Sequence, residues 1–365
     1  MSVPPPLHVL SVFGARPQFV KAAVVSRALA AANARAGHAI VRETSIHTGQ
    51  HWDHGMSQVF FDEMEIPAPT VNLGIGGGGH GAMTGRMLEA LEREMLERRP
   101  DLVLVYGDTN STLAAALAAA KLNVPVAHVE AGLRSFNRRM PEEINRVLVD
   151  HVAGLLFCPS RNAADQLARE GIVRGVSVTG DVMVDAQLHY AARAIRPSID
   201  GPFALATLHR AENTDDPARL RSIVGALREC PIPVVLPVHP RTRQALERLG
   251  DPASGGSLRL VEPLSYFEML GHLAAARFVV TDSGGLQKEA YVAGRRCLTL
   301  RDETEWVELV ECGANRLCGA DAVAIRSAFA WADAPLSSTS PIYGDGRAGD
   351  AIVARLLDRG AESTS

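Results

Sequence analysis

The stretch Asp101-Leu-Val-Leu-Val-Tyr-Gly-Asp108, followed by Val124-Pro-Val-Ala-His-Val-Glu130, decides the fold of this chain. Each piece is a short apolar run that ends in an acid, which predicts two strands covered on both faces. The alanine-rich segment Thr112–Lys121 between them predicts a helix. A strand–helix–strand unit of this kind makes its strands parallel, so Asp108 and Glu130 should meet at the sheet edge where open α/β sheets bind ligands.

More acids follow on the next predicted helix, which carries Glu142 and Glu143 in its first turn. Several carboxylates converging on one crevice indicate acid–base chemistry. Each also has a structural alternative: Asp108 could cap its helix, the two glutamates could simply suit the helix dipole, and Glu130 could pair with Arg134.

Strand-like and helix-like stretches alternate along the whole chain, which predicts the α/β fold class. The pattern pauses at the proline-containing linker Pro197–Pro202 and restarts, so we expect two Rossmann-like, doubly wound domains facing a cleft. Their predicted extents are residues 1–186 and 200–345, with a last helix in residues 346–365 returning to the first domain. The other expected strands are Val9–Phe13, Ile46–Thr48, Leu155–Cys158, Val176–Val178, Phe203–Thr207, Val234–Val238, Leu258–Val261, Phe278–Thr281 and Cys297–Leu300.

The composition argues against several classes of function. With 47% apolar residues, 21% charged residues and a formal net charge of −4, the 365-residue chain has no overall attraction for nucleic acid or acidic membranes. Its N-terminus lacks the features of a signal peptide, and no stretch resembles a membrane span. The five cysteines have no zinc-like spacing, so we expect buried free thiols, no metal site and a cytoplasmic location.

Two loops that follow predicted strands have the groups needed to bind phosphate. Arg16 lies in Gly14-Ala-Arg-Pro17, between a strand and a helix, and Ser283-Gly284-Gly285 has the same position in the second half. Glu289, one or two helical turns further on, can reach a ribose diol.

Histidines paired with arginines follow two more strands of the second half. They are His209 with Arg210, and His239 with Arg241. A single histidine in such a place is often a cap or a core residue, whereas two such pairs in one domain favour anion binding. Neither G-x-G-x-x-G nor a P-loop is present, which disfavours ordinary NAD or ATP binding.

These motifs together closely resemble the non-hydrolysing UDP-N-acetylglucosamine 2-epimerases over nearly the whole chain. The resemblance rests on the combination, since no single motif would be specific. The matching motifs are Gly14-Ala-Arg-Pro17, Tyr106-Gly-Asp-Thr109, His128-Val-Glu-Ala-Gly-Leu-Arg134, Pro141-Glu-Glu-Ile-Asn-Arg146, Thr179-Gly-Asp181, Leu208-His-Arg210, Pro237-Val-His239, Thr281-Asp-Ser-Gly-Gly285 and Arg301-Asp-Glu-Thr-Glu305.

The resemblance implies the two-domain architecture of glycosyltransferase type B, a homodimer, and inversion of C2 in a UDP-2-acetamido sugar without NAD or metal. A base would remove the C2 proton as UDP leaves C1, and the resulting glycal would be protonated on its other face. Asp108, Glu130 and Glu142 match the acid–base positions of the family, and His209 matches its catalytic histidine.

The same resemblance implies where the substrate binds. We expect Arg16, His239 and the Ser283–Gly285 backbone on the diphosphate, and Glu289 on the ribose. The remaining residues expected to bind substrate are Lys21, Arg134, Arg138, Arg139, Arg210, Ser283, Gly284, Gly285 and Arg301.

Several motifs look most like the branch of the family that acts on UDP-2,3-diacetamido-2,3-dideoxy-glucuronate. A C6 carboxylate would need an arginine, so Arg138 or Arg139 is predicted to bind it, although both could be solvated surface residues. The sequence also departs from the common family pattern: Gln18 stands where glutamate is usual, and Asp53 replaces the second glutamine of the family's allosteric loop.

Three rival functions would also use a UDP-sugar. A glycosyltransferase of the same architecture would need an acceptor but not the cluster of acids. A hydrolysing epimerase would release free N-acetylmannosamine and UDP. A non-catalytic sensor would bind the nucleotide sugar without exchanging the C2 proton.

Overall fold

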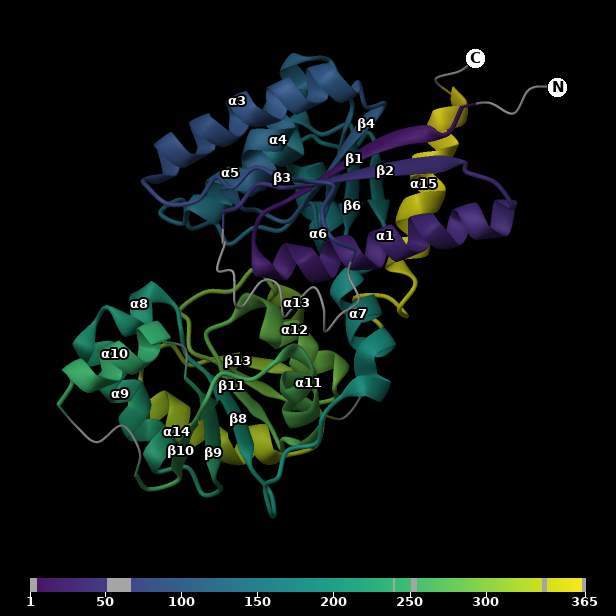
Figure 1. Cartoon of the computed structure of the whole chain (residues 1–365). Helices are drawn as coiled ribbons and strands as arrows, with labels where there is room; N and C mark the ends of the chain where they lie inside the picture. Colours follow the sequence, from purple (N-terminus) through teal and green to yellow (C-terminus); the bar gives the residue numbers. More distant parts are fainter. Residues whose placement is uncertain (1–4, 51–66, 239, 251–254, 337–339, 363–365) are drawn as a thin grey trace. The chain divides into compact units, whose positions relative to one another are not determined.

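The computed structural model describes residues 5–50, 67–238, 240–250, 255–336 and 340–362. They form two compact units, Met1–His189 with Pro341–Ser365, and Tyr190–Ser340 (Figure 1). The units therefore divide after residues 189 and 340, whereas the predicted limits are 186, 200 and 345. One reason is that the Asp181 N–H donates to the Tyr343 carbonyl at 2.8 Å, which ties the segment after Ser340 to the first unit.

A seven-stranded parallel sheet forms the centre of the first unit, in the order β3-β2-β1-β4-β5-β6-β7. Its inner strands are buried on both faces, as their continuous apolar sequences predict. The strands are β1 Leu7–Phe13, β2 Val41–His47, β3 Val71–Asn72, β4 Leu102–Tyr106, β5 Val126–Val129, β6 Leu155–Cys158 and β7 Val176–Val178.

Helices cover both faces of this sheet, with α3, α4 and α5 on one side and α1 with α15 on the other (Figure 1). Helices α1 and α15 pack closely against each other at Gly349, which has no side chain. A Cβ added to Gly349 would lie only 3.0 Å from a methyl of Val24 in α1. Asp185 also accepts the first N–H groups of α15. The helices are α1 Arg16–Ala36, α3 His80–Arg98, α4 Asn110–Lys121, α5 Pro141–Val152, α6 Arg161–Arg169, α7 Val182–Tyr190 and α15 Ala348–Glu362.

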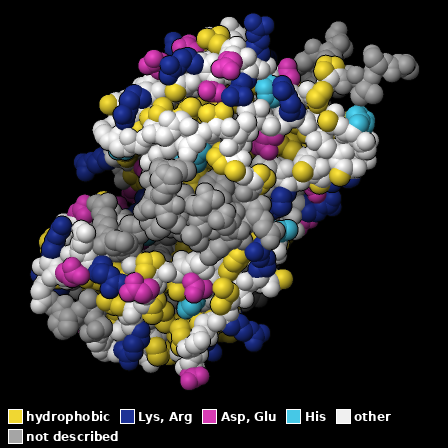
Figure 2. Space-filling view, viewed as in Figure 1, with side chains coloured by type: hydrophobic (Ala, Val, Ile, Leu, Met, Phe, Trp, Pro, Cys, Tyr) yellow, Lys and Arg dark blue, Asp and Glu magenta, His cyan; other side chains and the backbone are white. Residues whose placement is uncertain are grey.

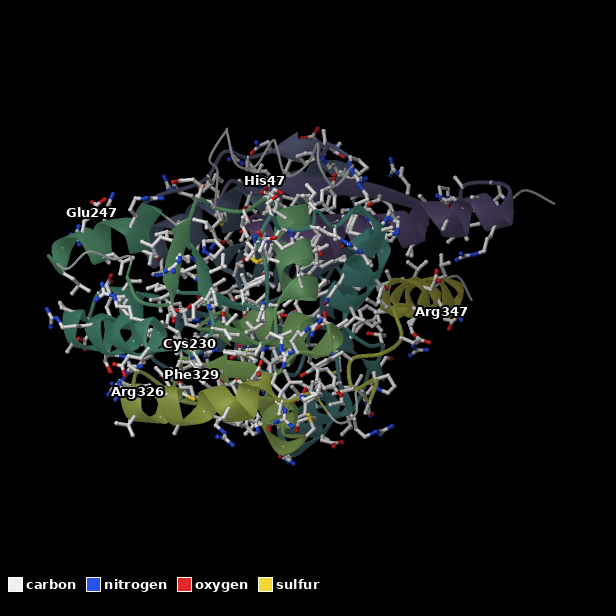
Figure 3. All side chains as sticks on the ribbon, turned by 90° about the horizontal axis from the view of Figure 1, so that it is seen from below. His47, Cys230, Glu247, Arg326, Phe329 and Arg347 are labelled. Atoms are coloured by element: carbon white, nitrogen blue, oxygen red, sulfur yellow. The ribbon has the colours of Figure 1, made fainter. Side chains whose placement is uncertain are left out.

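The second unit has a six-stranded parallel sheet in the order β10-β9-β8-β11-β12-β13. Phe329 of α14 and Cys230 share one of its buried apolar clusters, where Figure 3 labels both. The elements are β8 Ala204–Thr207, α8 Ala211–Thr214, α9 Pro217–Arg228, β9 Val234–Pro237, α10 Pro240–Arg248, β10 Leu258–Val261, α11 Tyr266–Ala275, β11 Val279–Thr281, α12 Gly284–Val292, β12 Cys297–Thr299, α13 Val307–Glu311, β13 Asn315–Leu317 and α14 Ala322–Asp333.

The strand order reverses once in each sheet, between β1 and β4 in the first unit and between β8 and β11 in the second. Ligands of doubly wound sheets bind outside the carboxyl ends of the strands at such a reversal. The predicted fold class, α/β with two Rossmann-like doubly wound units, is confirmed. Within the described residues, no helix is long and apolar enough to cross a membrane.

Candidate active site

Asp108 follows β4 after a single glycine, beside the strand-order reversal of the first unit. Its carboxylate ion-pairs with Arg146 of α5, and its side chain keeps 26% exposure. Its carbonyl accepts a hydrogen bond from the Asn145 amide at 2.8 Å. The helix cap that follows is Thr109 rather than Asp108, so the structural alternative of a capping role is wrong. An acid held in place and still partly exposed can accept a proton from a bound ligand.

Glu130 follows β5 and forms an ion pair with Lys21 of α1, with 2.6 Å between carboxylate and ammonium. Both side chains are about nine-tenths buried. Gly107 lies against this pair, since a Cβ added there would be in van der Waals contact with the Lys21 ammonium, at 3.4 Å. The alternative that Glu130 pairs with Arg134 is therefore wrong, and the predicted substrate ligand Lys21 instead holds the predicted catalytic acid.

Arg134 belongs to a buried charge network beneath these strand ends. Its guanidinium contacts Asp150 at 2.7 Å and Glu170 at 2.7 Å, and its side chain is only 2% exposed. Although burial opposes ionisation, hydrogen bonds from His128 and the charges of His128 and Arg134 hold the pKa of Asp150 below its ordinary value. The prediction that Arg134 binds substrate does not fit this geometry, because its donors are committed to protein groups.

His128 links this network to the loop that carries the first acid. One ring nitrogen lies 2.7 Å from the Asp150 carboxylate, and the other lies 2.7 Å from the Gly107 carbonyl. The Gly107 N–H in turn donates to the Val129 carbonyl at 2.9 Å. The peptide before Asp108 is thus fixed from both sides, which preorganises the acid.

The two glutamates at the start of α5 have different surroundings. Glu143 is buried and accepts hydrogen bonds from the Ser135 N–H and hydroxyl and from the Phe136 N–H, at 2.9 to 3.0 Å. It therefore stabilises the preceding loop. Glu142 is exposed at the first turn, so of the pair only Glu142 is accessible to a ligand. Its catalytic role stays a prediction.

Arg138 and Arg139 lie in the loop just before α5, and both side chains are exposed. Neither takes part in an ion pair with the residues that the structure describes. Both guanidinium groups are therefore accessible to an anionic ligand.

The loop between β1 and α1 differs from a free phosphate site. The Gln18 side-chain oxygen accepts the N–H groups of Gly14 and Ala15 at 2.8 and 2.9 Å. Its amide nitrogen donates to the Tyr106 carbonyl at 2.6 Å. Because Gln18 occupies these two backbone donors, they are not available to a phosphate, and the contact of Arg16 with the diphosphate stays a prediction. The side chain of Arg16, together with His239 and Asp53, lies outside what the structure describes.

The glycine-rich turn of the second unit begins α12, and Ser283 caps that helix. Nothing lies within 4 Å of a Cβ added at Gly285, whereas the Glu305 carboxylate would lie 2.5 Å from one added at Gly284. The first N–H groups of a helix are natural partners for an anion. The exposed Gly285 end of this turn is therefore the better phosphate position.

Arg301 and Glu289 flank that turn. Arg301 is 1% exposed and contacts Glu305 at 2.7 Å, and this burial does not fit the direct substrate contact predicted for Arg301. Glu289 is half-buried on α12, one turn beyond Gly285. Its predicted contact with ribose is compatible with this position.

His209 and Arg210 follow β8, at the strand-order reversal of the second unit. The His209 side chain is 48% exposed, and its Nδ1 lies 3.1 Å from the Asp282 carboxylate. The Arg210 Nε donates to the Asp282 carbonyl at 3.0 Å. Asp282 is a functional residue without a role predicted from the sequence, although it shows the same signal as Asp108: an acid at the end of a buried strand.

No group of three or more His, Cys, Asp or Glu residues in the described part of the chain is arranged to hold a metal ion. Figure 2 shows Lys and Arg interspersed with Asp and Glu on the face that it displays. The chain thus combines acids at the sheet edge of one unit with a glycine-rich helix start, a histidine and an arginine at that of the other. This combination, on two Rossmann-like units, defines an enzyme of nucleotide-sugar chemistry.

Comparisons with known proteins agree with this class. The family model described as UDP-N-acetylglucosamine 2-epimerase matches residues 33–357. The UDP-2,3-diacetamido-2,3-dideoxy-D-glucuronate 2-epimerase of Pseudomonas aeruginosa is 52% identical over 361 residues, covering 96% of this chain and 99% of that protein. The UDP-N-acetylglucosamine 2-epimerase of Methanocaldococcus jannaschii is 40% identical over 96% of this chain and 98% of its own length.

Solved structures give the same result. The crystal structure of the Methanocaldococcus jannaschii enzyme in complex with UDP-GlcNAc and UDP matches with a TM-score of 0.86 and 38% identity, covering 96% of this chain and 99% of that one. The chain belongs to the UDP-N-acetylglucosamine 2-epimerase family, and it is an isomerase. A calicheamicin glycosyltransferase, 18% identical with a TM-score of 0.58, shares the fold, as predicted for the type B architecture.

Proposed function

We propose that the protein epimerises C2 of UDP-2,3-diacetamido-2,3-dideoxy-glucuronate to the manno form, without net hydrolysis, for synthesis of a surface polysaccharide. The observation that carries this proposal is the sequence identity of 52%, over 96% of the chain, with a relative named for that substrate. Two exposed arginines before α5, Arg138 and Arg139, give the C6 carboxylate cationic partners. The alternative substrate is UDP-N-acetylglucosamine, which lacks this carboxylate.

The proposed chemistry is an elimination followed by re-addition. A base of the first unit takes the C2 proton, the electrons of that bond form the C1–C2 double bond, and the C1–O electrons leave with UDP. The glycal is then protonated on its other face, and UDP returns to C1. Asp108, Glu130 and Glu142 are the proposed acid–base residues, and His209 is proposed to stabilise the departing UDP.

The proposed nucleotide contacts use Ser283, Gly285 and Arg210 for the diphosphate and Glu289 for the ribose. The C2 proton is not adjacent to a carbonyl, so stabilisation of the leaving group must supply much of the rate. No NAD or metal is required by this mechanism. The glycosyltransferase and sensor functions lose support because neither needs an acid such as Asp108, held beside Arg146 and still partly exposed.

Product analysis tests the proposed function. With the diacetamido uronate, we expect a mixture of two UDP-sugars and no accumulation of free sugar, as judged by chromatography with mass detection. Free manno sugar with stoichiometric UDP would instead identify a hydrolysing epimerase. Faster turnover of UDP-N-acetylglucosamine than of the uronate would contradict the proposed substrate and favour UDP-N-acetylglucosamine instead.

Removing the arginines tests how the carboxylate is recognised. We expect Arg138→Ala combined with Arg139→Ala to lower kcat/KM for the uronate by about 10- to 100-fold, the value of one or two charge-assisted contacts. Turnover of UDP-N-acetylglucosamine should change little, which makes this substrate the internal control. Equal losses for both substrates, or none for the uronate, would contradict the assignment.

A homodimer is also proposed, because α5 exposes apolar side chains on one face. Ile144 and Leu148, one turn apart, are 47% and 43% exposed, and Phe136 in the loop before them is 71% exposed. We expect light scattering to give twice the chain mass, and Leu148→Lys to shift it towards the monomer. Val323→Lys, at an exposed apolar position on α14, is the control. A wild-type monomer would contradict the proposal.

The cytoplasmic location is proposed from the cysteines. Four of the five are buried free thiols, and burial raises the pKa of the Cys158 and Cys297 thiols to about 12. Unpaired thiols suit a reducing compartment.

A further inference from the structure

Asp282 directly follows β11 at the strand-order reversal of the second unit, and its carboxylate is completely buried. One oxygen accepts three hydrogen bonds from the neighbouring loop: the N–H of His209 at 3.0 Å, the N–H of Arg210 at 2.9 Å and the amide of Asn213 at 3.3 Å. The other oxygen lies 3.1 Å from Nδ1 of His209. A single carboxylate thus holds both the backbone and the ring of the histidine.

The charge of this carboxylate is maintained by its surroundings. Burial favours the neutral acid, but the hydrogen bond and charge of His209, together with the N–H groups of Arg210 and His209, hold the pKa of Asp282 below its ordinary value. An ionised carboxylate can only accept hydrogen bonds, so the proton facing it belongs to Nδ1 of the ring. The other ring nitrogen, Nε2, is then the one available to a ligand.

The exposure of His209 explains why such a partner matters. A side chain that is 48% exposed is not fixed by packing, so without a tether its ring would sample several rotamers and both tautomers. A carboxylate on Nδ1 selects one orientation and one tautomer, and it stabilises the positive charge that forms when Nε2 gains a proton.

We propose that Asp282 is the positioning residue for His209: it fixes the orientation and the tautomer of the ring so that Nε2 meets the diphosphate of the sugar nucleotide. This inference rests on the proposed function, which gives His209 its role. It adds to that function a residue that acts only through the histidine.

The variant Asp282→Asn separates this role from the support of the loop. Its remaining oxygen can still accept the N–H groups of His209 and Arg210. Its NH2 group would face Nδ1 of the ring and donate to it, which reverses the hydrogen bond and moves the ring proton to Nε2.

Nitrogen NMR of protein labelled at histidine reads this change without any substrate. At alkaline pH we expect His209, identified by the signals lost in His209→Asn, to be protonated at Nδ1 in the wild type and at Nε2 in Asp282→Asn. The same protonated nitrogen in both proteins would overturn the positioning role. This result does not depend on the reaction, so it separates failure of this inference from failure of the proposed function.

A double-mutant cycle gives the kinetic test. We expect Asp282→Asn to lower kcat/KM by about 10- to 100-fold, the usual effect of losing a residue that orients a catalytic group. In a His209→Asn background the same change should cost no more than about twofold. Equal losses in both backgrounds would show that Asp282 supports the fold and not the histidine. The matched control is Asp333→Asn, which removes only a surface pair with Arg277 and should leave activity unchanged.

Discussion

Replacing Asp108 by asparagine is expected to lower the rate of C2 epimerisation by about 1,000-fold, within the range for losing a general acid or base. Asparagine has nearly the same shape and can still accept a hydrogen bond from Arg146, but it cannot take up a proton. The acid also sits on a loop fixed by His128 and Asn145, so the substitution should leave its neighbours in place. Steady-state turnover of the UDP-sugar measures the loss.

The matched control is Asp101→Asn, at the opposite end of β4. Asp101 accepts the N–H of His8 and lies at the sheet edge where no ligand is predicted. Its variant should retain activity within about twofold, as distant surface substitutions do. UDP should still bind to Asp108→Asn, because the nucleotide contacts are proposed on the second unit. Full activity of Asp108→Asn would support a glycosyltransferase, which does not need this acid.

Gly132→Ala is expected to give a large loss of stability. Gly132 has φ of +83°, and an added Cβ would lie 2.3 Å from the backbone carbonyl oxygen of Ala163 in α6. The left-handed conformation costs roughly 1–2 kcal/mol and the overpacking roughly 1–3 kcal/mol, about 3 kcal/mol together. For a unit of this size, that loss lowers Tm by about 10 °C.

Gly171→Ala provides the control for the clash. Gly171 has φ of +81°, but nothing lies within 4 Å of a Cβ added there, so only the cost of the backbone conformation remains. Thermal unfolding followed by circular dichroism should rank Gly132→Ala well below Gly171→Ala. Similar Tm values for the two variants would contradict the close approach of Gly132 to α6.

The parallel sheets could be predicted from sequence because their inner strands are buried on both faces. Strands such as β4 and β5 are therefore uninterrupted apolar runs. The edge strands β3 and β13 could not be predicted from the sequence. The two residues Val71–Asn72 and the three residues Asn315–Leu317 are too few to form an apolar pattern. They become strands only by pairing with a neighbour already in place.

The positions of the acids could likewise be predicted, because the topology brings the ends of parallel strands to one edge. Their partners could not, since these come from distant segments: Lys21 of α1 pairs with Glu130, and Asp150 of α5 binds Arg134. The role of Asp282 could not be predicted from the sequence for a related reason. Its partner, His209, lies 73 residues earlier in the chain, and only the fold brings the two together.

Proton NMR in D2O tests the central claim most directly, that this chain exchanges the C2 proton of a UDP-2-acetamido sugar. The purified protein is incubated with UDP-2,3-diacetamido-2,3-dideoxy-glucuronate and, separately, with UDP-N-acetylglucosamine. We predict that deuterium enters C2 while a manno-configured UDP-sugar appears, and that the uronate reacts faster. Binding of both nucleotide sugars without any deuterium at C2 would contradict the elimination mechanism.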